Sequence, residues 1–181
     1  MEALCSPGRL LDIGPGAGAF LLHALARGWE VSGVEVQPEI AAAAERRTGA
    51  KVHAGEIGDQ EIQTERFDAV TMWDVIEHVS SVRATLAAAA SIVRPGGLLA
   101  LSTIHAGSLN ARVFGAHWAF WNRPGHVPEH LQGFRRQTLE MAARGAGFEP
   151  RVIRTQFIPG AVIEPLSRVM DIRPDRRPRP A

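Results

Sequence analysis

A carboxylate and three glycines near the beginning of the chain have the spacing of a ligand-binding turn. Asp12 stands two residues before Gly14, and Gly16 and Gly18 follow. Glycines let a ligand approach the backbone closely, and the first turn of a helix after them offers N–H groups that have no partner within the helix. A carboxylate beside such a turn repels phosphate but attracts an ammonium or a hydroxyl group. These residues therefore predict a site for a ligand that carries such groups.

The same glycines leave a second interpretation open. Gly14, Gly16 and Ala19 fit the G-x-G-x-x-A fingerprint of dinucleotide-binding turns. Glu35 lies about 20 residues further on, where that fingerprint has an acid for a ribose hydroxyl. Taken alone, this fingerprint is a weak signal. An NAD-binding oxidoreductase therefore remains an alternative.

Three histidines are candidates for a general base: His105, His126 and His130. The chain has one lysine and no tyrosine, so a base must come from His, Asp, Glu or Cys5. Imidazole titrates near neutral pH, which suits it to this task. Each of the three also has an alternative role as a hydrogen-bonded structural histidine.

Two of these histidines also raise the question of a metal. His126 and His130 are four residues apart, and such a pair binds zinc when both lie on one helix, with His105 or His117 as a third ligand. Pro128 lies between the pair and disfavours a regular helix. We therefore expect no metal.

The composition is that of a single globular domain. The chain has 181 residues, 45% of them hydrophobic, and a net charge of +1, so it has enough length for a sizeable core and no evident basic face for nucleic acid. Its single cysteine excludes an internal disulfide and indicates a reducing compartment. No apolar run resembles a membrane span or a leader. We therefore expect a cytoplasmic protein that binds neither nucleic acid nor membrane.

Strands and helices alternate along the first hundred residues. Apolar runs predict strands over 10–13, 31–36, 51–54, 67–72 and 98–102. Periodicity and stop residues predict helices over 19–27, 38–49 and 81–93. This alternation is typical of an α/β fold with a doubly wound, mostly parallel sheet, which binds ligands at the C-terminal ends of its strands.

A long segment, 104–136, follows the fifth strand and contains several aromatic residues and histidines. Segments of this length inside a compact domain are usually functional, so we expect a lid or acceptor-binding region there. A helix is expected over 137–144, a strand over 148–157 and a last helix over 161–170. We expect one domain over 1–170 and a mobile tail rich in arginine and proline over 171–181.

Several short motifs occur in the order and spacing of one enzyme family. They read L-D-I-G-P-G-A-G at 11–18, G-V-E at 33–35, F-D-A-V at 67–70, W-D-V-I-E-H-V at 73–79, R-P-G-G-L-L at 94–99 and P-E-H-L at 128–131. With them the chain resembles the class I S-adenosylmethionine-dependent methyltransferases, and its later motifs resemble the branch that includes ubiquinone-pathway-type O-methyltransferases. The resemblance implies a Rossmann-like sheet of six or seven strands with helices on both faces, and S-adenosyl-L-methionine as the cofactor.

The resemblance also implies roles for residues at the ends of the first two strands. Asp12 and the turn from Gly14 to Gly18, with Gly16 at its centre, would hold the amino-acid end of the cofactor. Glu35 would bind both ribose hydroxyls, which suits a carboxylate because it accepts two hydrogen bonds at once.

Residues after the third and fourth strands would complete the cofactor site. The resemblance places Glu56 near the adenine amino group and Ile57 against the adenine ring. Trp73 would lie beside the methionine portion, where an aromatic face favours a sulfonium cation. Glu77 and His78 follow directly, either to cap and pack the next helix or to touch the ligand.

The chain departs from the family pattern in several places. Val127 replaces the first proline of the usual P-P-E-H, and Ile104 with His105 replaces a common Pro-Asn pair. Few residues precede the first strand, so we expect the chain either to lack the N-terminal helical cover of the family or to build that cover elsewhere. One strand is expected after the helix over 137–144, where the family has two, which indicates either a shortened sheet or a homodimer that completes it.

The sequence thus predicts a methyltransferase that acts on a small-molecule or glycan-type acceptor, at oxygen. The first alternative is a protein that binds S-adenosylmethionine, has weak or no catalysis and acts through a partner. An NAD-binding oxidoreductase is the third. Methylation of nucleic-acid bases is disfavoured because W-D-V-I at 73–76 takes the place of a proline-rich aromatic tetrad.

Overall fold

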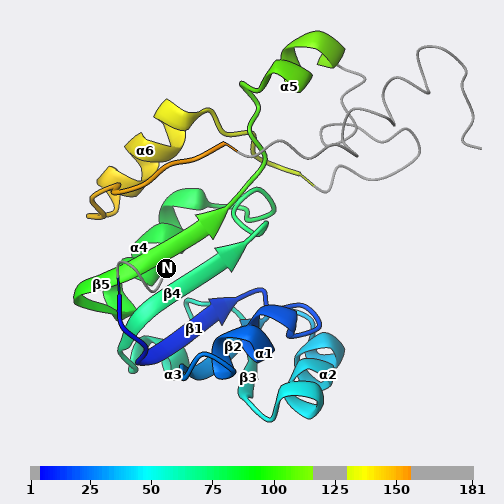
Figure 1. The fold of residues 1–181 in the computed structure, drawn as a ribbon, viewed down its shortest axis with the longest axis vertical. Helices are drawn as coiled ribbons and strands as arrows, with labels where there is room; N and C mark the ends of the chain where they lie inside the picture. The colour runs from blue at the N-terminus through cyan, green and yellow to red at the C-terminus, as the bar shows by residue number, and fades with distance from the viewer. Residues whose placement is uncertain (1–4, 116–129, 156–181) are drawn as a thin grey trace, which may run out of the picture.

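The computed structural model describes residues 5–115 and 130–155, and their core is one parallel sheet (Figure 1). Its strands are β1 (Arg9–Ile13), β2 (Glu30–Glu35), β3 (Lys51–Ala54), β4 (Phe67–Trp73) and β5 (Val93–Ser102). They lie in the order β3-β2-β1-β4-β5, and Leu10 of β1 pairs with Val31 of β2 on one side and Ala69 of β4 on the other. The chain changes direction across the sheet after β3. Ligands of such sheets bind at this switch point, beyond the C-terminal ends of β1 and β4.

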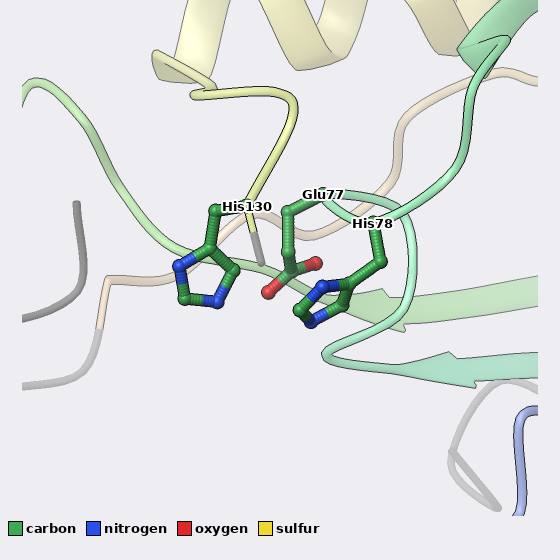
Figure 2. Close-up of side chains that lie close together, drawn as sticks. All are labelled: Glu77, His78 and His130. Carbon is green, nitrogen blue, oxygen red and sulfur yellow. The ribbon is translucent and has the colours of Figure 1, made fainter. Parts of the chain in front are cut away.

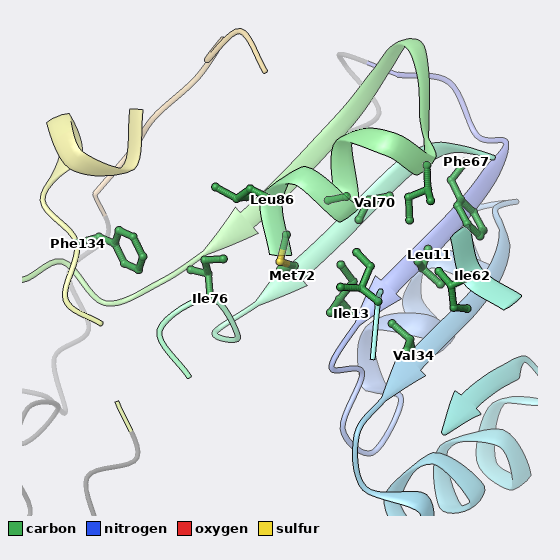
Figure 3. Packing of buried hydrophobic residues seen from close by; sticks show 13 residues of the cluster. Leu11, Ile13, Val34, Ile62, Phe67, Val70, Met72, Ile76, Leu86 and Phe134 are labelled. Atoms are coloured by element: carbon green, nitrogen blue, oxygen red, sulfur yellow. The ribbon is translucent and has the colours of Figure 1, made fainter. Parts of the chain in front are cut away.

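Helices cover both faces of the sheet, as predicted. They are α1 (Ala19–Leu25), α2 (Pro38–Thr48), α3 (Gln60–Gln63), α4 (Val82–Ile92), α5 (Leu109–Phe114) and α6 (Arg136–Gly145). Successive strand residues point to opposite faces. Leu10 therefore packs in a cluster with Leu21 of α1 and Ala44 of α2. On the other face, Leu11 packs in a second cluster with Ile62 of α3 and Leu86 of α4 (Figure 3). The α/β, doubly wound architecture is confirmed.

Local signals end and begin the helices where the sequence indicated. Gly28 follows α1 with a φ of 85° and Gly49 follows α2 with a φ of 70°, and glycine adopts this left-handed conformation without strain. The hydroxyl group of Ser81 accepts a hydrogen bond of 3.3 Å from the N–H of Ala84 and caps α4. These local interactions set where the helices that pack on the sheet begin and end.

The number of strands differs from the prediction. The sheet has five strands in residues 5–115 and 130–155, not six or seven. Residues 148–155 form no strand, so that part of the strand expected over 148–157 is wrong, and 156 and 157 lie outside the described residues. A suitable apolar pattern makes a strand only when a neighbouring strand pairs with its N–H and C=O groups. Residues 148–155 have no such pairing within the described sheet.

The fifth strand begins earlier than expected. β5 starts at Val93, five residues before the predicted start at 98, and includes the P-G-G turn. A register shift absorbs these residues, because Phe67 pairs with Val93 and Ala69 already pairs with Leu98. A Cβ atom on Gly97 would lie 2.8 Å from the carbonyl oxygen of Asp68, so only glycine permits this close approach.

The segment 104–136 contains a short helix that the sequence reading missed. The hydroxyl group of Ser108 accepts a hydrogen bond of 3.2 Å from the N–H of Ala111 and begins α5, which lies beyond the end of β5 in Figure 1. The short α3 was also missed. The remainder of this segment from 116 to 129, the helix expected over 161–170 and the tail over 171–181 lie outside the described residues. In the described part of the chain, no helix has the length and apolar character needed to span a membrane.

Candidate functional site

The turn between β1 and α1 is built by backbone hydrogen bonds and left-handed glycines. The N–H of Gly14 donates to the carbonyl oxygen of Val34 at 2.8 Å, and the N–H of Gly18 donates to that of Pro15 at 2.9 Å. Gly14, Gly16 and Gly18 have φ angles of 68°, 51° and 75°, a region that other residues rarely adopt. The turn therefore depends on glycine at all three positions.

The surroundings of these glycines differ. A Cβ atom on Gly14 would lie 2.7 Å from Cγ2 of Val75, and one on Gly18 would lie 2.6 Å from Cγ2 of Thr48. A Cβ atom on Gly16 would meet no atom within 4 Å. Gly14 and Gly18 thus pack against the protein, whereas Gly16 faces open space in which a ligand can approach the backbone.

Asp12 lies beside this turn as a buried carboxylate. Its side chain stands near the C-terminal end of β1 and is only 1% exposed. Its Oδ1 accepts a hydrogen bond of 2.6 Å from the hydroxyl group of Thr71 on β4. Burial raises the pKa of Asp12 to about 7, although the Thr71 hydrogen bond lowers it. A cationic group placed beside the turn would favour the ionised form, so the site fits a ligand with an ammonium group.

Glu35 ends β2 at the same edge of the sheet. It is 8% exposed, and its Oε1 accepts a hydrogen bond of 3.1 Å from the N–H of Gln37. Its backbone carbonyl oxygen accepts a hydrogen bond of 2.9 Å from the N–H of Gly55, directly after β3. The carboxylate therefore stands between the ends of two strands in a defined orientation, which suits binding to a pair of hydroxyl groups.

The two residues expected near an adenine lie in the loop after β3 and differ in burial. Glu56 is exposed, and its N–H donates a hydrogen bond of 2.9 Å to Oδ2 of Asp59. Ile57 is buried in the same core cluster as Ile13 and Val34. The ring-packing role of Ile57 remains a prediction.

Trp73 ends β4 and is 36% exposed. Its ring meets that of Phe20 of α1 edge to face, with 5.0 Å between centroids. The next residue, Asp74, has a φ of 55°, and its Oδ1 accepts a hydrogen bond of 2.7 Å from the hydroxyl group of Ser102 at the end of β5. This left-handed aspartate, which the sequence reading did not single out, holds the ends of β4 and β5 together beside Trp73.

Glu77 connects three segments at this edge. It is 0% exposed, and its Oε2 accepts a hydrogen bond of 2.9 Å from the hydroxyl group of Thr103, just after β5. Its backbone carbonyl oxygen accepts hydrogen bonds from the N–H groups of Leu131 at 2.8 Å and Gln132 at 3.0 Å. Glu77 therefore brings the segment before α6 to the ends of the central strands.

A second group of side chains gathers around this glutamate (Figure 2). The rings of His78 and His130 lie with centroids 4.8 Å apart, and one atom each of Glu77, His78 and His130 lie within 4.8 Å of one another. Oε1 of Glu77 is buried and accepts no hydrogen bond from the described residues. A carboxylate and two imidazoles at this spacing have the ligand atoms that could hold a metal ion.

The other candidate bases are placed differently. His105 forms an isolated bridge with Phe134, and its Nδ1 lies 3.5 Å from the hydroxyl group of Thr155. His126 and His117 lie outside the described residues. In residues 5–115 and 130–155, the group with metal-ligand spacing joins His130 to Glu77 and His78, not to His105.

Sequence reasoning singled out Glu77, His78 and His130 individually but did not predict that they meet. It also missed Thr71 as the partner of Asp12. The available signal was a polar residue within an otherwise apolar strand, T in A-V-T-M at 69–72. Such a residue in a central strand needs a hydrogen-bond partner, but only the strand order names it.

Comparison with known proteins identifies the family. Residues 2–152 match the family model of the methyltransferase domain. A ubiquinone biosynthesis O-methyltransferase of Aromatoleum aromaticum is 30% identical over 176 residues, 92% of this chain and 73% of that protein. One of Dechloromonas aromatica is 29% identical over 150 residues, 78% of this chain and 65% of that protein. The chain thus spans 65% of the length of the Dechloromonas aromatica protein and 73% of the length of the Aromatoleum aromaticum protein.

Solved structures show the same fold. A S-adenosylmethionine-dependent methyltransferase of Thermotoga maritima, described as a possible histamine N-methyltransferase, is 26% identical, with a TM-score of 0.67 over 82% of this chain and 68% of that chain. A sugar N-methyltransferase of a Streptoalloteichus species is 28% identical, with a TM-score of 0.52 over 57% of this chain and 44% of that chain. The chain therefore belongs to the class I S-adenosyl-L-methionine-dependent methyltransferases, and its cofactor is S-adenosyl-L-methionine.

Proposed function

We propose that the edge of the sheet described above holds S-adenosyl-L-methionine in a defined orientation. Asp12 and the turn around Gly16 would bind its amino-acid end, because the buried carboxylate favours an ammonium group and Gly16 faces open space. Glu35 would bind the ribose hydroxyls and Glu56 the adenine amino group. Trp73 would lie beside the sulfonium.

The reaction would transfer the methyl group to an oxygen of a small-molecule or glycan-type acceptor. The bound cofactor supplies an activated methyl group on a sulfonium. This methyl carbon would be open to in-line displacement by the acceptor oxygen, with sulfur keeping the electron pair of the broken bond. The protein aligns the two reactants and excludes water, and such positioning lowers barriers by about 7 to 11 kcal/mol.

A hydroxyl acceptor must also lose its proton, and the cluster of Glu77, His78 and His130 is the observation that carries this part of the proposal. His130 would accept the proton as the new bond forms, and the buried carboxylate of Glu77 would stabilise the resulting imidazolium. His105 and His126, which are not part of the described cluster, remain candidates from the sequence.

The relatives support two acceptor atoms. The ubiquinone biosynthesis enzymes are named as O-methyltransferases, which favours oxygen. The Streptoalloteichus structure is named as a sugar N-methyltransferase, so an amino group on a sugar is the second candidate. An amine acceptor also loses a proton, and the same histidine serves it. Binding to nucleic acid or membrane is not part of the proposal, and a homodimer remains a prediction.

Calorimetry and a methyl-transfer panel test the proposal. S-adenosyl-L-methionine and S-adenosylhomocysteine should bind, and NAD is the control ligand that should not. Turnover is then measured with labelled cofactor on paired acceptors, phenols and sugars against their amino analogues. Faster turnover of the hydroxyl members would support oxygen. Cofactor binding without turnover on any acceptor would favour a protein that acts through a partner.

Variants of the cluster test the base. His130→Ala should lower kcat by about 10²- to 10⁴-fold and leave the Kd for S-adenosylhomocysteine nearly unchanged. His23→Ala removes an exposed histidine on α1 and is the control. An unchanged kcat in His130→Ala would remove His130 as the base. Activity that is lost on chelation and restored by Mg²⁺ would indicate a cation at the cluster instead.

A further inference from the structure

One carboxylate organises the loop after β3. Oδ2 of Asp59 accepts the hydrogen bond of 2.9 Å from the N–H of Glu56 and lies 2.9 Å from Nε2 of His53 on β3. The N–H of Asp59 in turn donates to the carbonyl oxygen of Glu56 at 3.0 Å. Residues 56–59 are therefore closed into a turn by reciprocal hydrogen bonds between Glu56 and Asp59, and His53 ties that turn to the strand.

Asp59 uses its side chain in an unusual way for its position. It directly precedes α3, where an aspartate normally accepts a hydrogen bond from an N–H of the first helical turn. The side chain of Asp59 makes no such bond and points back to His53 and Glu56 instead. The hydrogen bonds from His53 and then Glu56 lower the pKa of Asp59, which keeps it ionised and able to accept both. The carboxylate of Asp59 thus stabilises the turn and does not cap α3.

The same turn is fastened to the strand that carries Glu35. The N–H of Gly55 donates to the carbonyl oxygen of Glu35. A Cβ atom on Gly55 would lie 2.7 Å from Nε2 of His53 and would also clash with the carboxylate of Asp59, so glycine is what allows the two side chains to meet here. The backbone of Glu56 is therefore bound to Asp59, and the residue directly before it, Gly55, is bound to the strand end that bears Glu35.

We propose that Asp59 and His53 are positioning residues that hold Glu56 for recognition of the cofactor's adenine amino group and so set the preference for adenine over a 6-oxopurine. The inference rests on the proposed role of Glu56. A carboxylate accepts a hydrogen bond from the amino group but is repelled by the carbonyl oxygen that replaces it in hypoxanthine. Glu56 is exposed, so its side chain discriminates only if its backbone is held in place.

The test compares two ligands that differ at this one group. The Kd values of S-adenosylhomocysteine and S-inosylhomocysteine are measured by calorimetry for the complete chain and its variants. The wild type should prefer the adenine ligand by about tenfold or more, the effect of one hydrogen bond to a charged group. Asp59→Ala and His53→Ala should each lose most of this preference. A general loss of stability would weaken both ligands alike and leave the ratio unchanged.

Two matched variants separate positioning from a general structural effect. Asp59→Asn should keep most of the preference, because the amide oxygen accepts the same two hydrogen bonds. Glu61→Ala removes an exposed carboxylate on α3 and should leave the ratio unchanged. If Asp59→Ala does not fold, His53→Ala alone decides the question. An unchanged ratio in folded Asp59→Ala or His53→Ala would overturn the inference.

Glu56→Ala distinguishes this inference from the assignment beneath it. If this variant loses the preference and Asp59→Ala keeps it, Glu56 reads the adenine but Asp59 does not position it. If Glu56→Ala keeps the preference, or the wild type shows none, the proposed role of Glu56 is wrong and the inference falls with it. Cofactor binding through Asp12 and Glu35 is tested separately by their own variants.

Discussion

The carboxylate of Asp12 accepts a hydrogen bond of 2.6 Å from the hydroxyl group of Thr71, across the two central strands of the sheet. Both side chains are buried, so this polar pair belongs to the core and at the same time borders the glycine turn. The proposed cofactor site therefore borders a carboxylate that is part of the core.

Cofactor affinity should rise with pH because of this buried carboxylate. Burial raises the pKa of Asp12 from 3.8 to about 7, so the folded protein holds a proton there that the unfolded chain has lost, and Asp12 lowers stability as pH rises between these values. A bound ammonium group favours the ionised form, so binding releases this proton below about pH 7. The Kd for S-adenosyl-L-methionine should fall by up to about tenfold per pH unit between about pH 5 and 7. Calorimetry in buffers of different ionisation enthalpy counts the released proton.

Asp12→Asn is the control for this pH dependence. The amide keeps a polar group beside Thr71 but cannot ionise, so the Kd should be weaker and nearly independent of pH over the same range. A slope in Asp12→Asn equal to that of the wild type would assign the pH dependence to another group.

Glu35→Ala should weaken cofactor binding while the fold stays intact. The loss of a charged acceptor for two hydroxyl groups should raise the Kd for S-adenosylhomocysteine by about 10- to 100-fold. Glu35→Gln keeps one acceptor oxygen, so its Kd should lie between those of the wild type and Glu35→Ala. Calorimetry gives the Kd, and circular dichroism reports the fold. Unchanged affinity in Glu35→Ala would remove the ribose assignment.

Alanine substitutions should separate the ligand-facing glycine from a structural one. Gly16→Ala and Gly28→Ala both place a side chain at positive φ with nothing within 4 Å, and each should lower the free energy of unfolding by about 1 to 2 kcal/mol. Only Gly16→Ala should also weaken cofactor binding, because its Cβ atom enters the space beside the turn. Gly14→Ala should be the least stable of the three variants, because the side chain of Val75 must move to make room for the new Cβ atom. Equal Kd values for the first two variants would show that the cofactor does not approach Gly16.

The hydrogen bond from Thr103 to Glu77 should contribute more to the free energy of unfolding than an exposed hydrogen bond does. Thr103→Val leaves the buried carboxylate without this donor and should lower the free energy of unfolding by about 1 to 3 kcal/mol. Adding Thr103→Val to Glu77→Leu should cost little further, because both polar groups are then gone. Urea unfolding of the four proteins in this cycle measures the coupling, with the exposed Thr64→Val as control. Additive effects would mean that the two side chains do not support each other.

Local chemistry made much of this protein predictable from its sequence. The strand at Lys51–Ala54 has the predicted bounds, and the predicted glycine turn follows Asp12. Hydrophobic periodicity and turn residues act within a few positions of one another, so a sequence displays them directly. For the same reason the local motifs are enough to identify the family.

Relationships between distant segments were decided only by the tertiary structure. The meeting of His130 with Glu77 and His78, the pairing of Asp12 with Thr71 and the absence of a strand over 148–155 all depend on which segments lie side by side. A side chain's spacing says what it is able to bind, but its partner is set by strand order and by the hydrogen-bonding needs of buried polar groups. The sequence by itself therefore determined the cofactor class and the elements that carry the site, and the packed sheet decided which side chains act together.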